Sequence, residues 1–190
     1  MGLTWELVIN SKRRIWNAFV RIIVLSFCVG ISSADAKTIY QTKSDFVNEA
    51  FSHTPPRPNT IWLTRQYSPT VKKILGHSYK SKRIKYWRNS AKSVWILEEI
   101  GKEKPITLGI IINNKKIQKL RVLIFREKRG EEVRHPFFTR QFIDIELTSD
   151  YQLNRYIDGI SGATLSVNAL GKLARMALYL DKVINEQHQK

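Results

Sequence analysis

Three consecutive segments rich in β-branched and aromatic residues constrain the fold of this 190-residue chain more than any other feature. They cover residues 93–100, 105–112 and 116–125, with the sequences SVWILEEI, PITLGIII and KIQKLRVLIF. Such residue types favour β-strands, because their side chains pack well on a pleated surface. Residues 113–115 (NNK) suit a tight turn between the second and third segments. The three segments therefore predict a sheet with a well covered face.

A long amphipathic helix is predicted after the sheet, towards the C-terminus. Apolar residues recur there with the i, i+3, i+4, i+7 spacing of one helical face, and charged residues occupy the other side. We expect the apolar face to pack as core. The predicted fold class is therefore α+β: a mainly antiparallel sheet packed against helices, with a long C-terminal amphipathic helix. The apolar positions are Leu170, Leu173, Ala174, Ala177, Leu178 and Ile184, and the charged ones are Lys172, Arg175, Lys182 and Glu186.

The chain before the sheet is predicted to be helical and basic. Residues 42–53 predict a short helix that the prolines of residues 54–58 end, and residues 68–75 predict a second one that Gly76 stops. The segment YKSKRIKYWR (79–88) then interleaves basic with aromatic residues. This segment fits either a solvated basic strand or a surface for an acidic partner.

The first 36 residues have the pattern of an export signal. Basic residues at 12–14 precede an apolar run at 22–31, and the small residues of ADA (34–36) suit a signal peptidase. The alternative is a retained membrane anchor, although Arg21 interrupts the longer apolar stretch. We expect a periplasmic protein, held at the inner membrane if the signal is not removed.

Several classes of site are absent from the sequence. The only cysteine, Cys28, lies within the predicted signal, so the exported chain would have no disulfide, no thiolate nucleophile and no C-x-x-C-H haem attachment. Its four histidines, at 53, 77, 135 and 188, are too scattered to indicate a metal site. The motifs G-x-G-x-x-G, H-E-x-x-H and G-x-S-x-G and the P-loop are missing. We therefore predict no catalytic residue and no metal centre.

The formal net charge of +16 predicts an acidic partner. An exported protein rarely meets nucleic acid, so we expect no nucleic-acid partner. The remaining candidates are anionic lipid at a membrane surface and an acidic electron-transfer protein such as a periplasmic cytochrome.

The stretch DGISGATLS (158–166) lies where the C-terminal helix is predicted to begin. Serine, threonine and aspartate are the ordinary N-cap residues, so this stretch fits simple helix capping. A helix N-terminus also favours a phosphate group, because its N–H groups are unpaired and its dipole is positive. Both interpretations remain open from the residues alone.

The run Asp158, Ser161, Gly162, Ala163, Thr164 resembles the D-x-x-S-G-A-T signature of the FMN-binding domain family. This family includes the C subunit of the sodium-pumping NADH:quinone oxidoreductase and the G subunit of the Rnf complex. The resemblance implies that Thr164 carries FMN through a phosphoester bond. It also implies that Ser161, Gly162 and Ala163 shape the phosphate turn. Asp158 would belong to the motif that a separate magnesium-dependent flavin transferase reads.

The segment FREKRGEEVRHPFFTRQF (125–142) extends the resemblance, with an acidic residue, a glycine and a later aromatic residue followed by Gln-Phe. The resemblance implies that Glu127 and Gly130 lie near the isoalloxazine ring. The respiratory subunits usually carry E-T-P-G-x-G where this chain has EKRGEE, which favours a stand-alone carrier. Three aromatic side chains fit either walls of a flavin site or ordinary core: Phe137, Phe138 and Trp95.

The resemblance gives the chain a predicted division and function. Residues 1–36 form the signal peptide, residues 37–90 a helical and basic segment, and residues 91–190 the FMN-binding domain. We expect an exported carrier of covalent FMN that transfers electrons, rather than an enzyme with its own small substrate. The alternative is a basic periplasmic module that binds anionic lipid or an acidic protein without flavin.

Overall fold

The computed structural model describes residues 38–90 and 92–188. The predicted signal peptide, residues 1–36, lies outside these ranges, so its export role and its cleavage stay predictions. Within the two ranges, no helix combines the length and the apolar character needed to cross a membrane.

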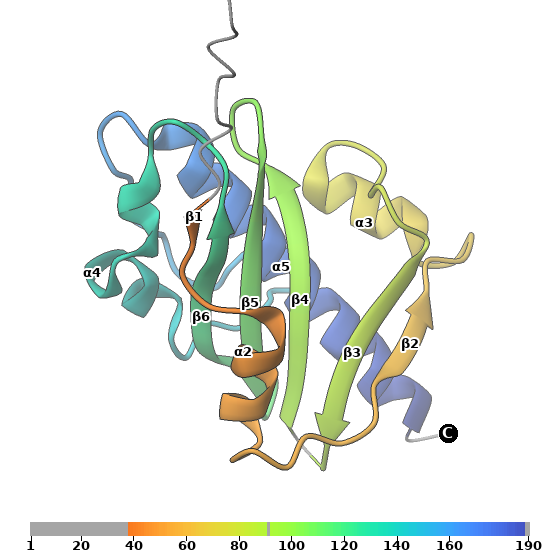
Figure 1. The fold of residues 1–190 in the computed structure, drawn as a ribbon. Helices are drawn as coiled ribbons and strands as arrows, with labels where there is room; N and C mark the ends of the chain where they lie inside the picture. Colours follow the sequence, from red (N-terminus) through yellow and green to blue (C-terminus); the bar gives the residue numbers. More distant parts are fainter. Residues whose placement is uncertain (1–37, 91, 189–190) are drawn as a thin grey trace, which may run out of the picture. The chain divides into compact units, whose positions relative to one another are not determined.

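A six-stranded antiparallel sheet forms the centre of the fold (Figure 1). The predicted α+β class with a mainly antiparallel sheet is confirmed, and the sheet has more strands than the three that the sequence predicts. Its spatial order is β1-β6-β5-β4-β3-β2. The three predicted strands correspond to β4, β5 and β6, and the predicted turn before β6 is confirmed by positive φ angles at Asn114 (50°) and Lys115 (66°). The strands are β1 (Thr38–Ile39), β2 (Asn59–Trp62), β3 (Arg83–Asn89), β4 (Lys92–Ile100), β5 (Pro105–Asn113) and β6 (Lys116–Phe125).

Helices cover both faces of this sheet (Figure 1). Helix α5 (Thr164–His188) and helix α3 (Ser68–Leu75) lie on one face, and helix α2 (Lys43–Ala50) lies on the other. Helix α3 has the predicted bounds, and α2 covers residues 43–50 of the predicted 42–53. The Oγ1 atom of Thr42 caps α2 by accepting a hydrogen bond from the Asp45 N–H (3.1 Å).

The segment between β6 and α5 holds three short helical turns that the sequence did not predict. They are η1 (Glu131–Arg134), α4 (Pro136–Thr139) and η2 (Arg140–Phe142). Phe138 and Phe142 from these turns are fully buried and meet edge to face, with ring centroids 5.7 Å apart. The long predicted loop is therefore anchored to the core rather than free.

The predicted basic segment supplies a strand to the same sheet. Strand β3 pairs with β4 across the predicted boundary at residue 91, with Tyr86 opposite Trp95. Ile84 and Tyr86 point into the core, whereas Arg83 and Lys85 are exposed. Residues 83–88 of this segment therefore belong to a strand, and a surface for an acidic partner stays a prediction.

Trp95 packs at the centre of the core between the sheet and α5. Its ring is fully buried and stacks on Tyr86 with centroids 4.9 Å apart. Its Nε1–H donates to Ser93 Oγ (2.8 Å), and Ser93 Oγ donates in turn to Oδ1 of the buried Asp181 (2.5 Å). These hydrogen bonds join β4 to α5. Asp181 lies about 25 Å along the helix from Thr164, since an α-helix rises 1.5 Å per residue.

Candidate functional site

The first turn of α5 begins without a side-chain cap. The Ala163 carbonyl accepts the first helical hydrogen bond from the Val167 N–H (2.9 Å), and the Ala163 N–H donates to the Ile160 carbonyl (3.0 Å). Ala163 is therefore the N-cap residue, and its side chain has no oxygen that could accept a hydrogen bond from the first turn. Among residues 38–90 and 92–188, no side chain accepts a hydrogen bond from the N–H groups of residues 164–166. The positive end of the helix is therefore left uncompensated.

Two glycines shape the approach to this helix start. Gly162 has φ +81°, and a Cβ built on it would meet no atom within 4 Å. Gly130 has φ +86°, and a Cβ there would lie 2.7 Å from Ser166 Oγ and 3.5 Å from the Ala163 Cβ. Gly162 is required by its backbone conformation alone. Gly130 is required by both its conformation and the close contact between its loop and α5.

Glu127 organises the neighbouring turn between β4 and β5. Its Oε1 atom accepts three backbone hydrogen bonds, from the N–H groups of Lys102 (2.5 Å), Glu103 (2.7 Å) and Lys104 (2.9 Å). The residue is only 9% exposed. A carboxylate with this many N–H donors is strongly held in place. Glu127 therefore supports the site, and its predicted proximity to the flavin ring stays a prediction.

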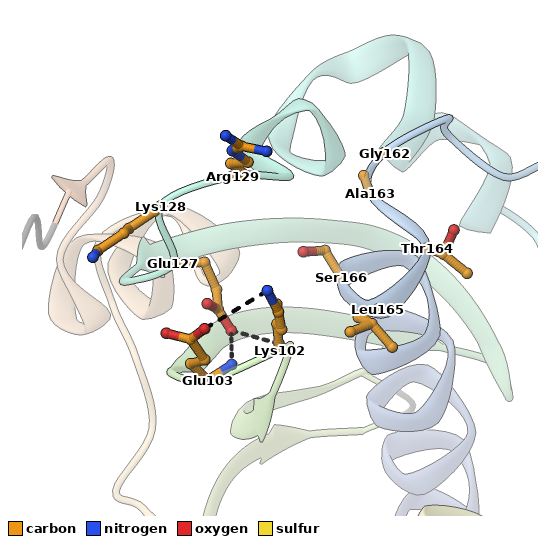
Figure 2. Close-up of a pocket in the computed structure, with 10 residues that line it drawn as sticks. All are labelled: Lys102, Glu103, Glu127, Lys128, Arg129, Gly162, Ala163, Thr164, Leu165 and Ser166. Carbon is orange, nitrogen blue, oxygen red and sulfur yellow. Dashed lines mark hydrogen bonds and ion pairs between the residues drawn. The ribbon is translucent and has the colours of Figure 1, made fainter.

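A cavity of about 600 Å³ lies between this turn and the start of α5. Figure 2 shows Ser166 directed from the helix towards the Glu127 side, with Thr164 at the outer rim. Two of the lining cations, Lys128 and Arg129, are exposed and have no ion-pair partner among the described residues. The volume falls within the range of small-molecule sites. The lining residues are Lys102, Glu103, Glu127, Lys128, Arg129, Gly162, Ala163, Thr164, Leu165 and Ser166.

The other predicted motif residues lie beside the cavity rather than in its wall. Asp158 and Ser161 are exposed. Gln141 holds the backbone of Asp158 from both sides, since its Oε1 accepts from the Asp158 N–H (2.8 Å) and its Nε2 donates to the Asp158 carbonyl (3.5 Å). The glutamine of the loop thus fixes the first residue of the motif. Gly130 contributes through its contact with Ser166 and Ala163.

None of the three aromatic candidates lines the cavity. Trp95 and Phe138 are fully buried, so the core interpretation holds for both. Phe137 is 63% exposed and stacks on His135, with ring centroids 6.1 Å apart. The residues that sequence reasoning missed are the cations Lys102, Lys128 and Arg129. The sequence hints at two of these cations only through their position, because Lys128 and Arg129 directly follow Glu127.

Residues 101–179 match the family model described as the FMN-binding domain. Over this segment the chain is similar to the FMN-binding domain family. No curated protein matches the sequence. The matched segment runs from the turn that Glu127 holds into the middle of α5, so it contains the cavity and the complete motif. The match supports FMN binding and, at the level of the family, electron transfer.

Replacement of Glu127 tests its supporting role. We expect Glu127→Ala to lower the free energy of unfolding by about 2–3 kcal/mol, because three partly buried N–H groups lose a charged acceptor. Glu127→Gln keeps one acceptor oxygen and is expected to cost about 1 kcal/mol. Urea unfolding measures both. Glu103→Gln is the matched control in the same turn, and an alanine variant no less stable than this control would contradict the assigned role.

Proposed function

We propose that the chain is an exported flavoprotein that carries FMN as a phosphoester on Thr164 and acts as an electron carrier. One observation carries the attachment site: the exposed Thr164 hydroxyl stands at an uncapped helix start and lines the same cavity as Lys128 and Arg129, two cations without an ion-pair partner among the described residues. Covalent attachment, export and the electron-transfer partners are all parts of this proposal.

The residues present fit a bound phosphoester. Free N–H groups and the helix dipole stabilise a negative charge at the first turn by about 0.3–1 kcal/mol. A Cβ built on Gly162 would meet no atom within 4 Å, so the backbone just before Thr164 is open to an approaching group. Lys128 and Arg129 supply further positive charge in the cavity wall. The flavin, when bound, supplies the redox chemistry, and the protein sets its orientation and surroundings.

We propose that a separate enzyme attaches FMN to Thr164. Within residues 38–90 and 92–188, no histidine or carboxylate is hydrogen-bonded to the Thr164 hydroxyl. A threonine hydroxyl without an adjacent base is a weak nucleophile. The base and the metal ion would therefore come from a magnesium-dependent flavin transferase. The exposure of Thr164 and of Asp158 leaves both accessible to such a partner.

Co-expression with a flavin transferase tests the proposal directly. The purified protein should give a band that fluoresces after denaturing electrophoresis, and its mass should increase by that of FMN less one water. N-terminal sequencing of periplasmic protein should begin at residue 37. A dark band in the presence of a transferase that labels another substrate would overturn the flavin assignment.

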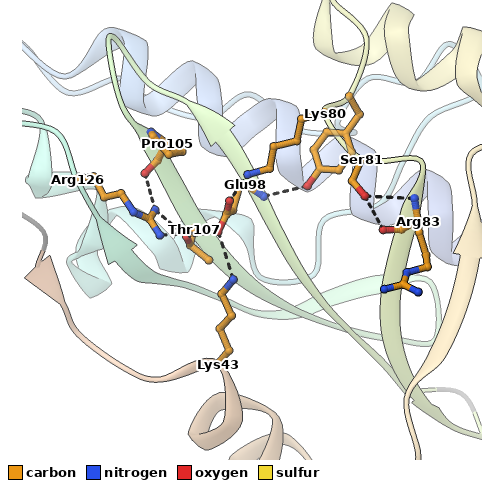
Figure 3. A network of polar contacts seen from close by, with 9 residues as sticks. Lys43, Lys80, Ser81, Arg83, Glu98, Pro105, Thr107 and Arg126 are labelled. Atoms are coloured by element: carbon orange, nitrogen blue, oxygen red, sulfur yellow. Dashed lines mark hydrogen bonds and ion pairs between the residues drawn. The ribbon is translucent and has the colours of Figure 1, made fainter.

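The outer face of β2 and β3 supports the second candidate, a basic module for anionic lipid. Trp62 is 58% exposed, and Arg83, its register partner on β3, is also exposed. Lys85 lies on the same face, beyond the part of the sheet that α2 covers. Figure 3 shows that the carboxylate next to this face, Glu98, is already surrounded by cations. The face is therefore basic and aromatic, as surfaces that bind anionic membranes are.

Vesicle binding separates the two candidates. If the lipid module is correct, flavin-free protein should sediment with vesicles of phosphatidylglycerol and phosphatidylcholine at low salt and be released at high salt. Trp62→Ala and Lys85→Gln should weaken that binding. If the protein binds the vesicles but never acquires flavin in the co-expression experiment, the lipid module is favoured over the electron carrier.

The lowered pKa of Glu98, on this face, predicts that the protein becomes less stable as the pH falls into the acid range. Burial alone would raise the pKa of Glu98, but hydrogen bonds from Lys80 and Thr107 and the charge of Lys43 outweigh burial and lower that pKa to about 2. Its ordinary pKa is 4.5, so the stabilisation is present above pH 4.5 and is lost as the pH falls towards 2.

Urea unfolding of Glu98→Gln between pH 5 and pH 2 measures this contribution. The wild type should lose about 1–2 kcal/mol more than the variant over this interval, once solvent screening is allowed for. Glu132→Gln, at an exposed carboxyl, is the control. Equal losses in the wild type and in Glu98→Gln would contradict the prediction.

A further inference from the structure

A second cavity, of about 660 Å³, runs along α5 next to the first one. The segment 152–157 forms one wall, and Leu165, Asn168, Gly171 and Lys172 of α5 contribute to the other. Leu165 also lines the cavity at Thr164, so the two spaces are neighbours. Nothing in the proposed attachment of FMN uses this second cavity.

Among the described residues that line the second cavity, three are cations and none is a carboxylate. The cations are Arg155, Lys172 and Arg175. The Nη2 group of Arg155 donates to the carbonyls of Gln141 and Ile143, at 2.8 Å each. These hydrogen bonds to neutral oxygens orient the guanidinium without cancelling its charge.

Arg175 is held in the same way. Its Nη1 donates to the Gln152 side chain (2.9 Å), and its Nη2 donates to the Ile74 carbonyl (3.2 Å). Lys172 differs, because its Nζ lies 3.9 Å from Oε1 of the buried Glu99, an oxygen that His77 already engages at 2.7 Å. The cavity therefore keeps an excess of positive charge that is fixed in position, which favours an anionic occupant.

Gly171 is a second, independent sign of an occupant. It lies in the interior of α5, where glycine costs about 1 kcal/mol relative to alanine. A Cβ built on Gly171 would meet no atom within 4 Å, so packing within the described chain does not require glycine there. Because Gly171 has no side chain, the α5 wall of the cavity stays open at this point.

We propose that this second cavity binds a small organic anion with at least two acid groups, next to the site of FMN. The three cations match the acid groups, and Leu153, Ile157 and Leu165 match an apolar body. The position next to FMN rests on the proposed function, whereas the charges and the open wall belong to the protein alone. The flavin ring itself is the competing occupant.

Titration of flavin-free protein with succinate, followed by amide NMR, tests the proposal. Succinate should shift the amides of Asn168, Gly171 and Tyr156 saturably. Asn168→Asp adds a like charge to the cavity without touching the hydrogen bonds of the arginines, and it should weaken binding about tenfold. Asn89→Asp, the same change at an exposed position on β3, should leave the affinity unchanged.

Several outcomes would overturn the proposal. These are the absence of saturable shifts at the three amides, an Asn168→Asp variant that binds as tightly as wild type, and inorganic phosphate that binds as well as succinate. Repetition with flavinylated protein completes the test. Retained binding supports an anion site beside the flavin, whereas loss of binding assigns the cavity to the flavin ring and overturns the proposal. Protein that binds succinate but never acquires flavin would contradict only the proposed function.

Discussion

Thr164→Ala is expected to abolish covalent flavin completely. The fluorescent band should disappear from a denaturing gel and the mass should return to that of the unmodified chain, because alanine has no oxygen for the phosphoester. The variant should remain folded, since Thr164 is exposed and alanine is the better helix former. Thermal unfolding that matches the flavin-free wild type would show that loss of flavin is not loss of fold.

Ser166→Ala is the matched control for this prediction. Its hydroxyl lies in the same helical turn but is buried against Gly130. We expect this variant to be labelled by the transferase. A fluorescent Thr164→Ala band would move the attachment away from Thr164. A dark Ser166→Ala band in the same experiment would then move it to Ser166.

Strands β4 to β6 and helix α5 could be predicted because their signals are local. The hairpin turn at 113–115 and the apolar stripe of α5 are both visible within a few residues. Strand β3 also had a local signal, the alternation of inward Ile84 and Tyr86 with outward Arg83 and Lys85, but its charges fitted a partner surface equally well. Strand β1 has two residues, too few for any periodicity.

The motif predicted the place of the site but not its electrostatics. Thr164 and Glu127 do line one cavity, yet they lie 37 positions apart, and the resemblance alone brought them together. The contributions of Lys102 and Gln141 depend on contacts between distant segments. Such contacts are set by tertiary packing, which residue spacing does not reveal.

The packing of α2 on the sheet is the clearest example of such a contact. A Cβ on Gly109 of β5 would lie 2.5–2.7 Å from three carbon atoms of the Phe46 ring. Phe46 is fully buried, and β5 is held between β4 and β6, so neither side can move away easily. The glycine is present because the helix rests on the strand at this point.

Gly109→Ala is therefore expected to lower the free energy of unfolding by about 2–4 kcal/mol, since one added carbon overpacks a buried contact. Urea unfolding measures the change. Gly159→Ala, at an exposed glycine with open space around it, is the matched control and should cost less than about 0.5 kcal/mol.

A double-mutant cycle with Phe46→Leu isolates the contact between the two residues. Phe46→Leu should destabilise on its own by about 1–2 kcal/mol, but it removes the ring that the Gly109→Ala methyl group strikes. The two losses should therefore sum to more than the loss in the double variant, by at least about 1 kcal/mol. Strict additivity would mean that Phe46 does not rest on Gly109. The cycle also measures how far α2 stabilises the segment that matches the FMN-binding domain, because α2 reaches the sheet of that segment through this ring.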